Sequence, residues 1–165
     1  MGKIYNIDEL LKVLAEPRQV QKRVVFTNGC FDLMHAGHVS YLREARHQGD
    51  LLVVGLNSDQ SVRAIKGSSR PIVGQEMRAQ VLEALECVDY ITLFDDPDPL
   101  KLIMALKPDV LVKGADWEEA QIVGAREVRD SGGDVVRIPL MPGISTSEII
   151  RRIVEKNDEL LKVKE

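Results

Sequence analysis

The sequence comprises 165 residues, of which 44% are apolar and 29% charged, and its formal net charge at pH 7 is -4. This length supports one well-packed domain, and the composition is that of an ordinary globular protein. The acidic balance argues against a partner that is a nucleic acid, because such surfaces normally carry a stripe of Lys and Arg.

The amino-terminal segment, residues 1–22, contains one helical pattern, NIDELLKVLAE, which we expect to pack on the outside of the domain. It has no apolar stretch of signal-peptide type, and no run in the chain approaches the about 18 apolar residues of a membrane span. Cys30 and Cys87 lie far apart and outside any CxxC spacing, which favours reduced thiols. We therefore expect a cytoplasmic protein with no membrane partner.

Five short runs rich in Val, Ile and Leu follow this segment. Their hydrophobicity is continuous rather than alternating, which is typical of strands covered on both faces. The runs occupy residues 23–28, 50–57, 89–94, 109–114 and 134–140.

Helical patterns separate these runs and follow the last one. They occupy residues 38–49, 75–85, 99–106, 124–133 and 145–157. Because strands and helices alternate, the sequence predicts an α/β fold, a doubly wound, Rossmann-like sheet of five parallel strands with helices on both faces. No repeat, linker or change of composition divides the chain. We predict a single domain over residues 1–165, with a polar tail at 155–165 that frays.

Two of the three histidines, His35 and His38, follow the first predicted strand, in the stretch HAGH. Ligands of this fold class bind beyond the carboxyl ends of the strands. Residues three apart near a helix start share a face, so both imidazoles can converge on one phosphate at the helix N-terminus. Gly37 between them lets a bulky group approach the backbone.

The alternatives for this pair are ordinary surface or core histidines and a zinc site. Only one further histidine, His47, is present, and no cysteine has ligand spacing, so we predict no protein-held metal. The sequence also lacks a G-x-S-x-G elbow, a Walker A motif and a G-x-G-x-x-G fingerprint.

TNGCFDLMHAGH resembles the first signature of the HxGH nucleotidyltransferase superfamily, which is cytidylyltransferase-like, and GISTSEI at 143–149 resembles its second, an IST-type phosphate loop. Three further stretches resemble motifs of the adenylyltransferase domain of bacterial ADP-heptose synthases, in the same order and at similar spacing. These are KGSSRPI at 66–72, LVKGADW at 111–117 and VGAREVRDSGGDVVRIPL at 123–140. The similarity runs from about residue 7 to about residue 154.

The resemblance implies transfer of AMP from ATP to D-glycero-β-D-manno-heptose 1-phosphate, which gives ADP-heptose and pyrophosphate for lipopolysaccharide core synthesis. It implies Mg²⁺ that arrives with ATP and is held mostly by phosphate oxygens and water. Many heptose enzymes carry a sugar kinase domain on the same chain. This sequence has none, so we expect a separate heptose kinase acting upstream. Relatives are often dimers, so the resemblance also allows a homodimer.

The nucleophile of this reaction is an ionised phosphate, so the site needs cations and N–H donors rather than a general base. His35 and His38 are expected to hold the α- and β-phosphates, and Lys66, on the polar loop IKGSSRP, to meet the sugar phosphate. These three are the predicted catalytic residues.

Trp117 is in the segment that borders the nucleotide base in the family. The predicted nucleotide-binding residues are Asn28, Gly29, Phe31, Asp32, Gly37, Lys113, Asp116, Ser145, Thr146 and Ser147. The predicted substrate-binding residues are Asp59, Lys66 and Arg78.

Several of these residues also have a purely structural interpretation. Ser145 to Ser147 open the last predicted helix and can simply cap it. Asp59 can cap the helix that follows it, and Arg78 can be a surface residue. Asp32 has three roles open to it: orienting a histidine, helping to hold magnesium, or bonding the backbone of its own turn.

Two other functions were weighed against AMP transfer. The first is a cytidylyltransferase for glycerol 3-phosphate or another polyol phosphate. The glycerol enzymes carry an arginine three residues before the glycine of the IST signature, where this chain has Leu140. The second is a non-catalytic nucleotide-binding module, whose expected mark is loss of a signature histidine or hydroxyl. Neither is lost here.

Overall fold

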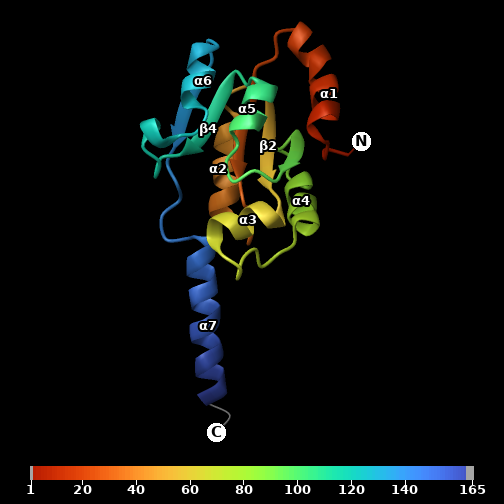
Figure 1. Ribbon diagram of the computed structural model, residues 1–165. Helices are drawn as coiled ribbons and strands as arrows, with labels where there is room; N and C mark the ends of the chain where they lie inside the picture. The colour runs from red at the N-terminus through yellow and green to blue at the C-terminus, as the bar shows by residue number, and fades with distance from the viewer. Residues whose placement is uncertain (1, 163–165) are drawn as a thin grey trace.

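Five parallel strands form one sheet at the centre of the molecule, in the order β3-β2-β1-β4-β5. The computed structural model describes residues 2–162 of the protein (Figure 1). The strands are β1 (Val24–Gly29), β2 (Leu51–Asn57), β3 (Tyr90–Phe94), β4 (Val110–Gly114) and β5 (Asp134–Ile138). The predicted doubly wound parallel sheet is therefore confirmed, and each predicted run forms a strand.

Helices connect and flank these strands. They are α1 (Ile7–Gln19), α2 (Ala36–Arg46), α3 (Asp59–Lys66), α4 (Gln75–Glu83), α5 (Leu100–Leu106), α6 (Ala125–Asp130), α7 (Thr146–Lys162) and a short 3-10 helix, η1 (Glu119–Gln121). No helix within residues 2–162 combines the length and the apolar character needed to cross a membrane.

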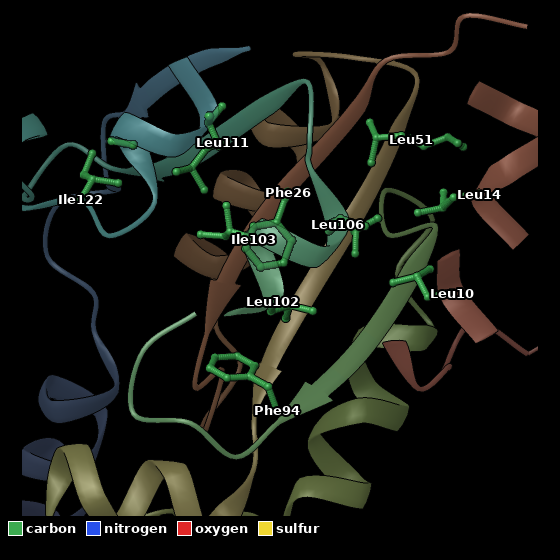
Figure 2. Packing of buried hydrophobic residues seen from close by; sticks show 14 residues of the cluster. Leu10, Leu14, Phe26, Leu51, Phe94, Leu102, Ile103, Leu106, Leu111 and Ile122 are labelled. Carbon is green, nitrogen blue, oxygen red and sulfur yellow. The ribbon is translucent and has the colours of Figure 1, made fainter. Parts of the chain in front are cut away.

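The strands bury alternate side chains in two separate cores. Val24 and Phe26 of β1 pack in one core with side chains of α1, α5 and α6, whereas Val25 packs in the other with side chains of α2 and α4. Figure 2 shows part of the first core, with Phe26 beside Leu102 and Ile103 of α5. Helices thus cover both faces of the sheet, which explains why the strand runs are apolar throughout.

Helix α1 contributes two fully buried side chains, Leu10 and Leu14, to this first core. It begins with a capping box, in which the Asn6 side chain accepts a hydrogen bond from the Glu9 amide at 3.0 Å and the Glu9 carboxylate accepts one from the Asn6 amide at 3.3 Å. Such a box satisfies two backbone donors that the first helical turn leaves unpaired.

Helix α3 extends further than the sequence indicates, because Ile65 and Lys66, which the sequence places in a polar loop, are its last residues. Lys66 is therefore the last residue of a helix and not a loop residue. The helix is short and buries only one apolar side chain, Val62, so it leaves almost no periodic signal. Its start is fixed by Ser58, whose hydroxyl accepts a hydrogen bond from the Ser61 amide at 3.2 Å.

Helix α7 is also longer than expected, and residues 155–162 are helical where the sequence predicts a fraying tail. Ion pairs along the helix support it: Arg151 contacts Glu148 at 2.6 Å and Glu155 at 2.5 Å. Pairs at this spacing stabilise a helix locally. Residues 163–165 lie outside the described residues.

The order of the strands creates a topological switch point beside β1. The chain runs outward from β1 to β2 and β3, then returns to the other side of β1 to form β4 and β5. β1 pairs with β2 as far as Gly29, but with β4 only at Val25–Val110 and Phe26–Leu111. The two strands therefore separate toward their carboxyl ends, where ligands bind in this class of fold.

Replacing Leu106 by Ala should lower the free energy of unfolding by about 2–5 kcal/mol, because this fully buried side chain of α5 would leave a cavity in the first core. Met104→Ala on the same helix is the matched control, since Met104 is 56% exposed and its loss should cost at most about 0.5 kcal/mol. Chemical denaturation measures both. Equal losses would contradict the packing described here.

Candidate active site

A cavity of about 570 Å³ opens at the carboxyl edge of the sheet, a volume typical of small-ligand sites. We call this cavity the cleft. Its walls come from the carboxyl ends of the strands and from the segments that follow all five of them. The predicted residues that line it are Asn28, Gly29, Phe31, Asp32, His35, Gly37, His38, Lys66, Lys113, Asp116, Ser145, Thr146 and Ser147. The structure thus brings together every predicted catalytic and nucleotide-binding residue.

Side chains bridge the gap that β1 and β4 leave between them. The hydroxyl of Tyr41, from α2, shares a 2.7 Å hydrogen bond with the Thr27 hydroxyl and donates to the Val112 carbonyl at 3.2 Å. Nearer the cleft, the Lys113 ammonium donates to the Asn28 side-chain oxygen. Burial lowers the pKa of Lys113 to about 8, so the ammonium keeps most of its charge at pH 7.

The two signature histidines lie against each other at the start of α2. His35 is the N-cap residue of this helix, and its ring stacks on that of His38 with centroids 3.8 Å apart and an interplanar angle of 21°. The ring of Phe31 meets His38 edge-on at 5.4 Å. Both Nδ1 atoms are buried and have no hydrogen-bond partner among the described residues.

Gly37 allows this arrangement because it has no side chain. A Cβ at this position would lie 3.0 Å from Nδ1 of His35 and 3.2 Å from a methyl group of Ile144. Ile144 belongs to the second signature, so the glycine lets the two signatures approach closely. Phe31 adds a further constraint, since its φ of 43° lies in the left-handed region that bulky residues rarely adopt.

Burial disfavours the charged imidazolium form of both histidine rings. Burial lowers the pKa of His38 to about 4, with a smaller contribution from the neighbouring His35. Burial also lowers the pKa of His35. A bound phosphate has the opposite effect, because a nearby negative charge favours the imidazolium. Anion binding and proton uptake are therefore coupled in this cleft.

The ligand-free protein should lose stability as the pH falls from about 6.5 toward 4. Between these values the unfolded chain binds a proton at His38 that the folded protein excludes. The contribution of His38 to the free energy of unfolding is therefore constant above pH 6.5 and decreases as the pH falls below it. Denaturation at several pH values should show a shallower slope for His38→Gln. His47→Gln, at an exposed position, is the matched control. An unchanged slope in His38→Gln would contradict the assignment.

Asp32 anchors a loop rather than orienting a histidine. Its carboxylate accepts hydrogen bonds from Arg70 Nε at 2.6 Å and from the amides of Ile72 and Val73 at 2.9 and 2.8 Å. Burial opposes ionisation of Asp32, but these hydrogen bonds outweigh it and lower the pKa. All of these partners lie in residues 67–74, which we call the anchored loop.

Asp59 and Arg78, predicted to bind substrate, lie outside the lining of the cleft and pair with each other. Arg78 is 1% exposed and its guanidinium is fully engaged. It donates to Asp59 at 2.7 Å, to the Val73 carbonyl at 2.9 Å and to the Cys30 carbonyl at 2.5 Å. These contacts tie the anchored loop to the first signature, so Arg78 stabilises the site from behind.

The hydroxyl residues of the second signature divide their roles. The Ser145 hydroxyl accepts a hydrogen bond from the Glu148 amide at 3.1 Å and so caps α7. Thr146 and Ser147 also line the cleft, in the first turn of this helix. A capped helix N-terminus that faces a cavity is a common anion site.

The cleft also contains residues that the sequence did not single out for a role there. Tyr41 lies three residues after His38 on the same helix, so helical spacing could have identified it. Arg70 lies within a quoted motif but received no role. The remaining additional lining residues include Asn57, Ile65, Pro97, Asp98, Pro99, Gln121, Val123 and Met141. These residues come from the ends of β2, α3 and η1 and from loops, and no helical spacing relates them to the signature residues.

Comparison with protein families and with curated proteins gives consistent matches. The family model described as cytidylyltransferase-like matches residues 26–152. The bifunctional protein HldE of Methylobacillus flagellatus is 54% identical over 151 residues, which cover 92% of this chain and 31% of that protein. HldE of Geobacter sulfurreducens is 50% identical over 158 residues, which cover 96% and 32%. The chain thus spans about a third of the length of these relatives.

Solved structures share the fold. The lipopolysaccharide core biosynthesis protein from Thermoplasma volcanium superposes with a TM-score of 0.62 at 30% identity, over 73% of this chain and 98% of that chain. The pantoate-beta-alanine ligase from Francisella tularensis, solved with beta-gamma ATP and beta-alanine, superposes with a TM-score of 0.61 over 98% and 80%. At 18% identity, this second match bears on the fold alone.

Proposed function

Because the chain belongs to the cytidylyltransferase-like family, we propose that it transfers AMP from ATP to D-glycero-β-D-manno-heptose 1-phosphate. The products are ADP-heptose, for lipopolysaccharide core synthesis, and pyrophosphate. The matches to HldE and to a lipopolysaccharide core biosynthesis protein confirm the resemblance found in the sequence motifs. The acceptor already carries a phosphate, so the proposal includes an upstream heptose kinase as its source.

The observation that carries the proposal is the meeting of the two signatures at one cavity. Stacked histidines from the first and hydroxyls from the second line the same cleft, together with two lysines. Each of these groups donates hydrogen bonds or positive charge, as a triphosphate requires.

The residues support an in-line displacement without a general base. A phosphate oxygen of the sugar phosphate forms a bond to the α-phosphorus of ATP as the bond to pyrophosphate breaks. In this proposal His35 and His38 donate to the transferring phosphoryl group, and the half-buried Lys113 adds a positive charge from the same cleft. Their donors gain strength as charge develops on the phosphoryl oxygens, which lowers the barrier.

Magnesium fits the cleft as an ion that the triphosphate carries. Among the described side chains, which end at residue 157, no group of three or more His, Cys, Asp or Glu is arranged to hold a metal. Asp116 and Asp98 are the lining carboxylates that could contact such an ion, although Oδ1 of Asp98 accepts a hydrogen bond from the Leu100 amide at 2.9 Å; Asp32 is engaged by the anchored loop. When bound, the ion would neutralise phosphate charge.

The choice of ATP over CTP rests on Leu140. This side chain lines the cleft, 50% exposed, close to Gly114 at the end of β4. The arginine of the glycerol cytidylyltransferases would stand here, and leucine offers no donor to a base or phosphate. The intact histidines and hydroxyls likewise disfavour a non-catalytic nucleotide-binding module.

A pyrophosphate-release assay tests the proposal directly. We expect turnover with ATP and heptose 1-phosphate, and at least about tenfold lower kcat/KM when CTP replaces ATP, since one or two lost polar contacts to the base cost about this much. Glycerol 3-phosphate is the matched acceptor control. Faster turnover with CTP and glycerol 3-phosphate would contradict AMP transfer and would favour the cytidylyltransferase alternative.

His38→Ala should lower kcat by about 10²–10³-fold, or about 2.7–4 kcal/mol, because it removes a preorganised donor to the transition state. ATP affinity should stay within about tenfold, and His38→Asn, which keeps a donor of similar reach, should recover part of the rate. Steady-state kinetics and ATP titration on folded protein measure these effects. A variant that keeps more than about a tenth of the wild-type kcat would exclude His38 from catalysis.

A further inference from the structure

Arg70 stands out in the anchored loop because its guanidinium is only partly used. Its Nε donates to Asp32 at 2.6 Å, and its side chain is 18% exposed at the wall of the cleft. Among the side chains described, those of residues 2–157, and the backbone of residues 2–162, Nη1 and Nη2 find no hydrogen-bond partner. The side chain therefore presents up to four N–H donors that no described protein group accepts.

Arg78, on α4 just after the anchored loop, differs from Arg70 in how many of its guanidinium nitrogens bond to the protein. All three guanidinium nitrogens of Arg78 donate to protein oxygens, and that side chain is buried. Arg78 thus uses its guanidinium to hold the anchored loop in place, whereas Arg70 is held only through its Nε, by Asp32. A guanidinium fixed at Nε, with its two other nitrogens free, has the geometry for bidentate binding of a phosphate.

Asp32 fixes the orientation of Arg70, because it binds both the Arg70 side chain and the backbone just after it. Its carboxylate, 1% exposed, accepts from the Arg70 side chain and from the amides of Ile72 and Val73, two and three residues further along. The backbone and the guanidinium of the loop are therefore set by one buried anion. Such preorganisation reduces the entropy lost when a ligand binds.

Arg70 shares its wall of the cleft with Lys66, the last residue of α3. Burial raises the pKa of Cys30, and both cations act against that shift, Lys66 more strongly. Two positive charges thus border the same point in the cleft. The carboxylate of Asp32 offsets one of them, so this wall keeps a net positive charge.

The strand order places this wall on one side of the histidines. α3 and the anchored loop follow β2, and β2 neighbours β1 on the side opposite β4. Asp116 follows β4, and the second signature follows β5, so both leave the sheet on the other side. In-line transfer requires the attacking oxygen to approach opposite the leaving pyrophosphate.

We propose that Arg70 binds the phosphate of the acceptor in the proposed AMP transfer, with Asp32 as its positioning residue. The ligand class is a phosphate monoester that presents two oxygens to the Nη1 and Nη2 donors. The proposal rests on the proposed function for the identity of the acceptor. The assigned donor atoms come from the contacts of Arg70 itself.

The test is equilibrium binding to full-length protein saturated with α,β-methylene-ATP, with heptose 1-phosphate as the titrant. Arg70→Gln should raise the Kd for heptose 1-phosphate about tenfold or more and leave the Kd for α,β-methylene-ATP within about twofold. Arg70→Lys, which keeps the charge but loses the fork, should fall in between. Arg63→Gln, exposed on α3 outside the cleft, is the matched control.

Asp32→Asn, which keeps an acceptor for the loop amides, tests the positioning role. It should raise the Kd for heptose 1-phosphate, and the double variant Asp32→Asn/Arg70→Gln should bind no more weakly than Arg70→Gln alone, because both act through one contact. Additive losses would mean that Asp32 acts only through general loop structure. The Arg70 variants test the main assignment even if Asp32→Asn does not fold.

The outcomes separate this assignment from the proposed function. A larger loss for α,β-methylene-ATP than for heptose 1-phosphate, or no loss for either, overturns the role of Arg70 while AMP transfer by the wild type stands. Conversely, a wild type that binds heptose 1-phosphate through Arg70 but releases no pyrophosphate overturns the proposed reaction alone. A wild type that binds no heptose 1-phosphate overturns both.

Discussion

The site depends on the early separation of β1 and β4. Two central strands that stopped pairing without substitutes would leave backbone groups of the sheet unsatisfied. Here Tyr41 fills the gap and bonds both strands, and Lys113 joins Asn28 further along. The opening is therefore stabilised by the same side chains that line the cleft. A sheet paired along its full length would have no space for a triphosphate at this position.

A second layer of contacts holds the parts of the cleft in register. Asp32, in the turn after β1, accepts a hydrogen bond from Arg70 of the anchored loop. Arg78 of α4 donates both to the Cys30 carbonyl of that turn and to the Val73 carbonyl of the loop. Breaking one partner of a buried ion pair is costly, because the other charge remains buried. The cleft thus has an outer layer that meets ligands and an inner layer of engaged charges that keeps its shape.

Sequence predicted the sheet and most of the site because both follow local rules. Continuous apolar runs identify buried strands, and functional residues follow the strands. Sequence did not predict how far α3 runs, because its single buried apolar residue, Val62, gives no periodicity. It also left the roles of Asp32 and Arg78 open, since their partners are set by how one loop folds onto another. The left-handed φ of Phe31 has no signal in the residue type.

The unpartnered Nδ1 atoms of His35 and His38 mean that the residues proposed for catalysis lower the stability of the fold. A buried polar atom without a partner costs about 1–3 kcal/mol, so this pair of histidines is a weak point of the fold. Directed evolution for heat resistance alone would therefore favour apolar replacements at these two positions. Selection for turnover would retain the histidines, because the proposed transfer uses them as donors.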